Sequence, residues 1–507
     1  MKKILYNTLT LIAGLTFLAS CNLDKYPETA INTTEAMESP ADCYNFLTGL
    51  YASTKSMYSG FYTYSTDLMT DCYHAIKNFG NWDGEYYTYS IEASTGDVAT
   101  VWNNFYGRIG NANFLITGAK NLIENGNLST GDLESVQEYY GEACFLRALM
   151  YFKLTEYFCK AYDKSTAEST FGVPVVTEYA PTAVASKYPH RGTLAATNAQ
   201  IDEDLKEAEK YVTTEGSPNA AYVTKDIVTA LRARFALSAQ DYQTAYDNAN
   251  SLIQGKKYAL VTDAAAFAEG WVNDNLSETL WQPVIVDASD GGSANSYFIN
   301  NPTGNDGDDD PQYLPEDWVL NLYDASADIR YNAYFEERAI DARGNKGNLV
   351  LLVKFPGNKK FNTSASSRYI NMPKIFRIAE MYLIAAEAAY NNGNEKAASD
   401  ILNDLRTARI AGWAKTEYSG TTLQKEIRDE RVRELFGEGF RLSDIKRWHI
   451  GFSRSAGQDP SLLQTDTNYV NLSLPADSPK FVWPIPTTEI SANPQMKGEQ
   501  NEGYTSE

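Results

Sequence analysis

The chain has 507 residues, 43% of them hydrophobic and 21% charged, so it can bury a large core as one elaborate domain or as several ordinary ones. Its formal net charge is −21 at pH 7. An acidic surface of this kind repels nucleic acids and anionic lipid headgroups, which argues against a phosphate-rich partner.

The first residues have the pattern of an export signal. Lys2 and Lys3 precede an apolar run over residues 4–18, and Leu18-Ala19-Ser20-Cys21 resembles a bacterial lipobox. Because the run is too short to span a membrane, residues 1–20 are predicted to be a lipoprotein signal peptide. Cys21 is then the first mature residue and carries a lipid anchor, whereas the alternative is an ordinary secretory leader with an incidental cysteine. Cleavage of the signal peptide removes Lys2 and Lys3 and no acidic residue, so the formal net charge changes from −21 to −23.

Helical periodicity dominates the chain after a polar, extended tether at residues 21–40. A helix pair around Gln240 has alanines at Ala233 and Ala245, which match the small-residue positions of a tetratricopeptide repeat. A second pair around Gly393 has Ala386 and Ala398 in the corresponding places. These patterns predict a mainly α fold, a tetratricopeptide-like helical-repeat body with long loop-rich insertions. The predicted segments are a helical body at 41–280 with an aromatic loop at 58–90, a loop-rich insertion at 281–372, and a second helical pair with a C-terminal tail at 373–507.

Residues 426–448 are the most informative stretch, because arginines and apolar residues share one helical face there. Arg431 falls on the same face as Ile427 and Leu435 and is therefore expected to be buried. A buried guanidinium must be paired with a carboxylate. The predicted partners are Glu430, Glu434 and Glu438; Gly437 and Gly439 are expected to end the helix, and Arg441, Asp444 and Arg447 to share one side of the next helical turn.

This stretch closely resembles the C-terminal signature of the SusD/RagB family, surface lipoproteins that capture nutrients in Bacteroidetes-type bacteria. Residues 22–24, 145–152, 377–383, 402–406 and 483–486 also match that family, in the expected order. The resemblance implies an outer-membrane, lipid-anchored protein that faces the outside of the cell. It further implies a cap over a SusC-like TonB-dependent transporter, which receives a captured oligosaccharide when the cap opens and closes.

The sequence offers no constellation typical of an enzyme. His74, His190 and His449 are far apart, so no short-spaced zinc motif exists, and neither a GxSxG elbow nor a phosphate-binding loop occurs. No catalytic residue, metal ligand or cofactor is therefore predicted. A pair of carboxylates for glycoside hydrolysis stays open among 65 acidic residues. The acidic run of Asp306 and residues 308–310 departs from the EF-hand pattern and is interpreted as a solvated turn, with a calcium loop as the alternative.

Aromatic residues in non-helical stretches are the better functional signal, because a sugar lies with its C–H face on an aromatic ring while polar side chains bind its hydroxyls. Trp82 is the strongest candidate, since Gly80 and Gly84 bracket it and no helical neighbour covers it. The alternative for each aromatic residue is that it fixes its own loop to the helical body. The predicted ligand-binding residues are Tyr73, Asn81, Trp82, Asp83 and Tyr86 in the first loop and Tyr297 and Tyr313 in the second.

The sequence is compatible with three functions. The first is capture of an oligosaccharide. The second keeps the same architecture but binds oligopeptides, as in the RagB branch, and the third is a surface glycosidase. The sequence also leaves open whether Cys43 and Cys72 form a disulfide, whereas Cys144 and Cys159 lie fifteen positions apart in one predicted helix, roughly 22 Å, too far for a bridge.

Overall fold

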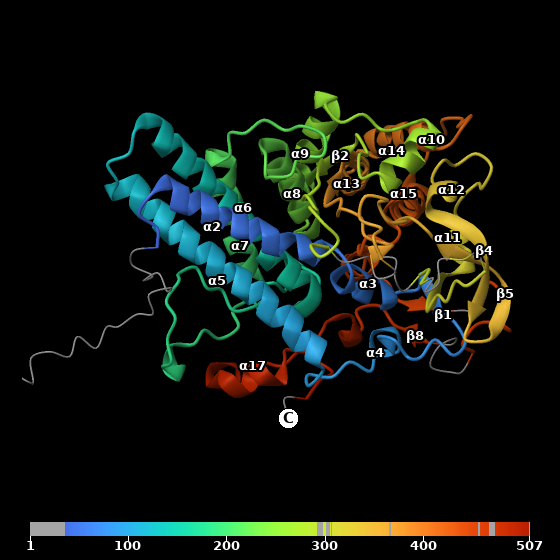
Figure 1. Ribbon diagram of the computed structural model, residues 1–507, viewed down its shortest axis with the longest axis horizontal. Helices are drawn as coiled ribbons and strands as arrows, with labels where there is room; N and C mark the ends of the chain where they lie inside the picture. The colour runs from blue at the N-terminus through green and yellow to red at the C-terminus, as the bar shows by residue number, and fades with distance from the viewer. Residues whose placement is uncertain are drawn as a thin grey trace, which may run out of the picture.

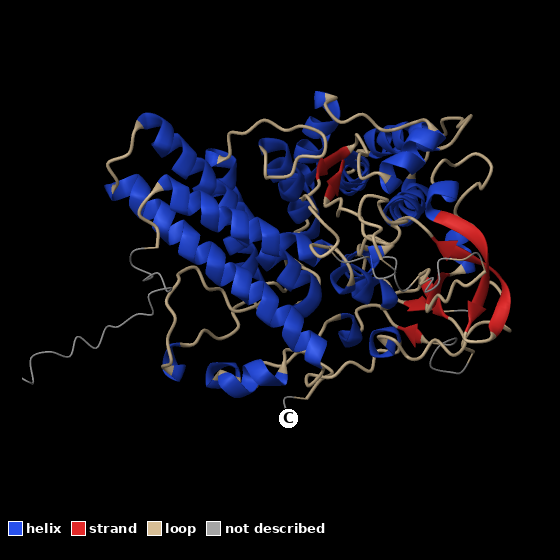
Figure 2. Cartoon of the chain, viewed as in Figure 1, coloured by secondary structure: helices blue, strands red, loops and turns tan. Residues whose placement is uncertain are grey.

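A computed structural model describes residues 36–291, 298–300, 305, 307–364, 367–454, 457–465 and 472–505. Long helices fill one side of the molecule, and most of the strands gather at the opposite end (Figures 1 and 2). The predicted signal peptide, the predicted lipidation site Cys21 and most of the predicted tether lie outside the described residues. The fold class predicted from the sequence is confirmed, because the described chain is mainly helical with short strands.

The N-terminal part of the chain forms a bundle of long helices. Helices α2 (Pro40–Lys55), α5 (Gly96–Asn125) and α6 (Thr130–Phe158) pack on one another, and α7 (Leu194–Tyr211) packs on α6 (Figure 1). The buried Arg147 of α6 donates from Nε to Asp204 of α7 over 2.9 Å, which ties these two helices together. The segment at 145–152 is buried throughout, because α6 is covered by neighbours on all sides.

The two predicted repeat pairs are confirmed. They are α8 (Lys225–Ser238) with α9 (Tyr242–Gly255), and α13 (Ile378–Asn391) with α14 (Glu395–Arg409). The four alanines that identified them have no exposed surface, which allows the helices to approach closely. Although the insertion separates the pairs in sequence, α9 packs on α13, and α13 also contacts α15 (Gly420–Leu435). The pairs therefore stack as one continuous helical array.

The insertion at 281–372 contains more regular structure than its composition suggests. Strands β4 (Phe335–Ala342) and β5 (Asn345–Leu352) form an antiparallel hairpin with only Arg343 and Gly344 in its turn. Both turn residues have positive φ, +52° and +86°, as a type I′ turn requires. Strand β1 (Tyr73–Ala75) pairs with β3 (Tyr313–Pro315), which brings the early aromatic loop beside the insertion.

The other elements are short. Strands β2 (Thr279–Trp281) and β6 (Phe376–Arg377) pair with each other, as do β7 (Phe452–Ser453) and β8 (Ser473–Leu474). The remaining α-helices are α3 (Phe61–Leu68), α4 (Gly84–Tyr87), α10 (Ala264–Val272), α11 (Asp317–Leu320), α12 (Tyr331–Tyr334), α16 (Arg441–Arg447) and α17 (Thr487–Ala492).

The stretch at 426–448 is buried as predicted, but one of its pairings differs. Arg431 is 4% exposed and binds Asp444 of α16 through Nε and Nη2, at 2.9 and 3.0 Å. The prediction that Glu430, Glu434 or Glu438 pairs with Arg431 is wrong, because these acids face other cations, most of which come from distant elements. Gly437 and Gly439 end the helix with φ of +75° and +79°, as predicted.

Those three glutamates belong to a buried ionic cluster. Six cations face six carboxylates, so the cluster as a whole is neutral. Each charge is compensated by close partners, which is what a low-dielectric interior requires. The cations are Arg330, Lys354, Arg377, Arg406, Arg409 and Arg433, and the acids are Glu278, Asp328, Glu426, Glu430, Glu434 and Glu438.

The cysteines Cys43, Cys72, Cys144 and Cys159 are all buried and free. The open question of a bond between Cys43 and Cys72 is therefore answered in the negative. Burial raises the pKa of the Cys43 thiol to about 11 and that of Cys144 to about 12. Thiols of this kind are protonated at neutral pH and act as small apolar side chains.

Candidate functional site

The loop between β1 and α4 carries the most exposed aromatic ring of the early region. Trp82 is 55% exposed and is the single tryptophan among the strongly exposed large hydrophobic residues that the structure describes. The backbone reaches this arrangement through left-handed conformations at Asn78, Gly80 and Asn81, with φ of +61°, +78° and +55°. Glycine and asparagine adopt such conformations at low cost, which explains their concentration here.

Hydrogen bonds from distant elements hold the loop in place. The Tyr313 hydroxyl on β3 donates to the Trp82 carbonyl over 2.6 Å, and the Tyr64 hydroxyl on α3 donates to Asp83 Oδ2 over 3.0 Å. From the hairpin turn, Arg343 Nη1 donates to the Asn78 carbonyl over 2.5 Å. Three separate elements therefore hold the loop, two through its backbone carbonyls and one through the Asp83 side chain, so the Trp82 ring is displayed on a preorganised support.

Polar residues flank Trp82 on the loop and on the hairpin turn that contacts it. Asn78, Asn81 and Arg343 are exposed, and Asp83 is half-buried. Amides, a carboxylate and a guanidinium can donate to or accept from hydroxyl groups, and the flat ring can hold an apolar face. The arrangement suits a ligand with one C–H face and a rim of hydroxyls.

Three of the predicted binding tyrosines do not present a ring to solvent, and this part of the prediction is corrected. Tyr73, Tyr86 and Tyr313 each have no exposed surface. Tyr73 is stacked against Phe298 and Phe436, Tyr86 packs on Phe61 and Trp483, and Tyr313 packs on Phe79 and Tyr87. The reason is that β1, β3 and α4 are covered on both sides, so their aromatic rings fill the core. Tyr297 lies outside the described residues.

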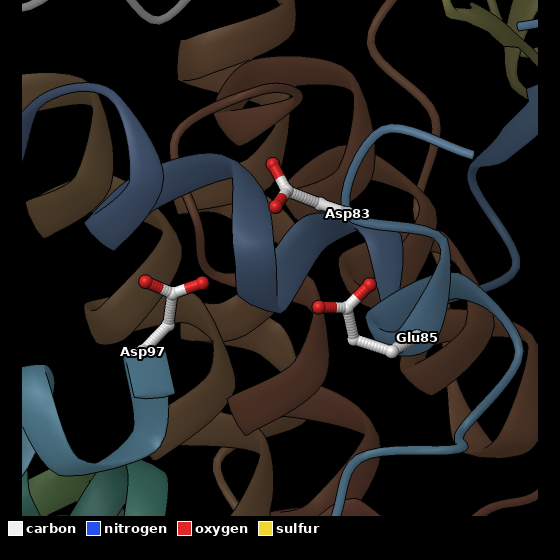
Figure 3. Close-up of side chains that lie close together, drawn as sticks. All are labelled: Asp83, Glu85 and Asp97. Atoms are coloured by element: carbon white, nitrogen blue, oxygen red, sulfur yellow. The ribbon is translucent and has the colours of Figure 1, made fainter. Parts of the chain in front are cut away.

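An acidic group lies beside the loop and was missed by the sequence reasoning. Carboxylate oxygens of Asp83, Glu85 and Asp97 all lie within 4.8 Å of one another, and Figure 3 shows the three side chains converging from the loop, α4 and the start of α5. Burial, and then the charge of Asp83, raise the pKa of Asp97 above its ordinary value. Oxygen ligands at this spacing are compatible with a divalent cation. No short-range sequence signal joins Asp97 to the other two acids.

In the described parts of the chain each histidine lies beside one acid: Glu316 for His74, Glu499 for His190 and Asp477 for His449. His74 is fully buried, with Nδ1 3.0 Å from Glu316 Oε1 and Nε2 2.9 Å from the Gln464 carbonyl, so no substrate can reach it. Asp309 and Asp310 pair with Arg338 and Arg343, at 3.4 and 3.2 Å. Each of these two acids therefore has an arginine as a counter-ion, although Asp310 Oδ1 is buried without a hydrogen-bond partner. Asp306 lies outside the described residues.

Comparison with known proteins gives consistent matches over both parts of the chain. The model of a family described as the SusD family matches residues 330–504, and that of a family described as starch-binding and associating with the outer membrane matches residues 22–237. The chain is 23% identical to the SusD-like protein P38 of Formosa agariphila, over 98% of both chains. A crystal structure of a SusD superfamily protein from Bacteroides thetaiotaomicron has a TM-score of 0.76 and 27% identity, covering 91% of this chain and 99% of that one. The chain belongs to the SusD family.

A further SusD-family relative matches over a shorter part of the chain. It is the starch-binding protein SusD of Bacteroides thetaiotaomicron, with 31% identity over 134 residues, or 26% of this chain and 21% of that protein. The resemblance read from the sequence motifs is thus confirmed. Within the described residues, none of the helices combines the length and apolar character that crossing a membrane would need.

Proposed function

We propose that this SusD-family protein is a cell-surface lipoprotein that binds an oligosaccharide on the loop carrying Trp82. The observation that carries the proposal is a half-exposed tryptophan ring on a loop that is held by hydrogen bonds from Tyr313, Tyr64 and Arg343. A ring held this firmly binds a sugar face without first paying to order the loop. The descriptions of the relatives, which name starch binding and the outer membrane, support the same ligand class and location.

The protein would hold its ligand without making or breaking a bond, and would pass it to a SusC-like TonB-dependent transporter. The lipid on Cys21 would keep it at the outer membrane, on the extracellular side. The stacked repeat pairs give it a broad helical surface that suits contact with a large partner. Co-purification of the lipidated protein with a transporter barrel from outer membranes tests this part, and recovery of the protein alone would contradict it.

Titration of residues 22–507 against libraries of glycans and of peptides tests the ligand class. Trp82→Ala should abolish most glycan binding, whereas Phe171→Ala removes a ring of similar exposure, 43%, on a different part of the chain and should leave binding unchanged. Binding of peptides in place of glycans would favour the oligopeptide alternative. Release of shorter glycans on prolonged incubation with repurified protein would favour a glycosidase.

A further inference from the structure

A polar pocket lies where the two repeat pairs meet the stretch at 426–448. The empty space in and in front of it measures about 540 Å³, part of which is open solvent. The α8–α9 turn contributes Gln240 and Tyr242, α13 contributes Tyr390 and Asn391, and α15 and α16 contribute Arg428 and the adjacent Trp448. None of the residues that line this pocket belongs to the loop that carries Trp82.

Arg428 has neither a hydrogen bond nor an ion pair, whereas the neighbouring Arg431, Arg441 and Arg447 each pair with an acid. Its Nε is buried and lacks a partner, although the side chain as a whole is only half-buried. The guanidinium group of Arg428 lies over the Trp448 ring, 5.0 Å from the ring centroid, and this contact helps to orient it. Burial lowers the pKa of Arg428 from its ordinary value, as expected for a cation with no close counter-ion.

The nearby acids cannot neutralise Arg428, because other arginines already use them. Glu387 receives both Nη atoms of Arg447 and also the Trp448 indole N–H, at 2.7 Å from Oε1. Asp444 binds Arg431 and Arg447. Asp71 binds Arg441 over 2.8 Å. Four arginines therefore face three carboxylates, and the uncompensated positive charge belongs to Arg428.

We propose that this pocket binds the carboxylate of a small organic acid, with Arg428 as the residue that receives it. A guanidinium pairs with a carboxylate through parallel N–H···O bonds. Arg428 lines the pocket and has no carboxylate partner of its own. One excess positive charge is balanced by a monoanion. A phosphate dianion would instead leave excess negative charge beside Glu387.

The rest of the pocket favours an acid that also carries hydroxyl groups. The side-chain amides of Gln240, Asn391 and Gln424 can both donate and accept, and the Tyr242 and Tyr390 phenols add further hydrogen-bonding groups. A sugar acid would use the amides and the guanidinium together, whereas a simple acid would use the guanidinium alone. The inference does not depend on glycan capture at Trp82, because the two sites share no residue.

Calorimetric titration of residues 22–507 with glucuronate, acetate, inorganic phosphate and glucose tests the proposal. The measurements are repeated in a Trp82→Ala background, so that the loop cannot account for any heat. Glucuronate and acetate should bind, glucose should not, and phosphate should bind more weakly than acetate. Tighter binding of glucuronate than of acetate would identify a sugar acid, and equal binding would identify a simple organic acid.

Arg428→Gln should weaken the binding of both acids by about tenfold or more, the loss expected for a charge-assisted bidentate contact. Lys425→Gln is the matched control, because Lys425 lies one turn earlier on α15 and is paired outward with Asp429, so this variant should bind as the parent does. Arg428→Gln should also fold normally, since no partner is left unpaired. Absence of acid binding, tighter binding of phosphate, or unchanged binding in Arg428→Gln would each overturn the proposal.

Discussion

Replacement of Glu434 by glutamine tests the buried ionic cluster most severely. Glu434 Oε1 accepts from Arg377 and Arg409, at 2.7 and 3.1 Å, and Oε2 accepts from Arg330 and Arg409, both at 3.0 Å. All four side chains are at most 1% exposed. Glutamine keeps the shape, but it turns an N–H₂ group toward guanidinium donors and removes one negative charge from a cluster of six cations and six acids.

The size of the effect follows from the charge that remains. Removing one partner of a buried ion pair costs about 3–5 kcal/mol, because the other charge is left uncompensated in the interior. We therefore expect Glu434→Gln to lower the free energy of unfolding by about that amount. For a chain of this size, this corresponds to a fall in the urea midpoint of about 1 M.

The pH dependence of this difference has a definite sign. Burial acts to raise the pKa of Glu434, but Arg409, Arg377 and Arg330 outweigh it and hold the pKa well below its ordinary value. A lowered pKa contributes stability that is present above the unfolded value, near 4.5, and that disappears as the pH falls through the folded value. The difference between the parent protein and Glu434→Gln should therefore stay constant from pH 7 to about pH 5 and shrink only in stronger acid.

Urea unfolding followed by tryptophan fluorescence provides the measurement, with Asp404→Asn as the control. Asp404 pairs with Lys415 over 2.6 Å, but both side chains are more than half exposed, so solvent screens the pair and no resolvable shift is expected. If Glu434→Gln and Asp404→Asn unfold at the same midpoint, the cluster does not stabilise the fold in the way described here.

The remaining predictions concern single positions. Gly439→Ala should destabilise the protein by about 1–2 kcal/mol, because φ is +79° at this position. Gly49→Ala should stabilise it, because Gly49 lies within helix α2 with open space around it and alanine favours a helix over glycine. The urea midpoints of unfolding measure both effects. Tyr313→Phe should weaken glycan binding about fivefold, because it removes the hydrogen bond to the Trp82 carbonyl. Tyr73→Phe should leave binding unchanged, because the Tyr73 hydroxyl has no hydrogen-bond partner. Equal affinities of the two variants would show that Tyr313 does not support the Trp82 loop. Burial raises the pKa of Glu142 to about 8, so the stability that this group contributes is present below pH 4.5 and is lost as the pH rises through 8. Glu142→Gln should therefore be as stable as the parent protein at pH 4 and more stable at pH 9. Free energies of unfolding that differ by the same amount at both pH values would contradict this.

The sequence predicted features that depend on local pattern. Small residues at Ala233 and Ala386 identified both repeat pairs, because close helix packing leaves a compositional mark. The burial of Arg431 followed from its position on an apolar helical face. The identity of the partner of Arg431 could not be predicted. Asp444 lies on the next helix, and the residue spacing does not show the direction in which the chain turns between the two helices.

The binding loop was predicted only in part, for a similar reason. Trp82 could be found because glycines bracket it and no helical neighbour covers it. Tyr73 and Tyr86 could not be distinguished from it, since a three-residue strand and a four-residue helix are too short to show a period that separates buried from exposed positions. The support from Arg343 comes from a hairpin 265 residues after Asn78 and has no local signal.

Isothermal titration of the parent protein and Trp82→Ala against the same glycan library shows whether the Trp82 ring binds sugar. We expect a saturable heat with at least one oligosaccharide, lost or weakened at least about thirtyfold in Trp82→Ala, as for the removal of a binding hot spot. Retention of full affinity in Trp82→Ala, with the fold intact, would contradict it.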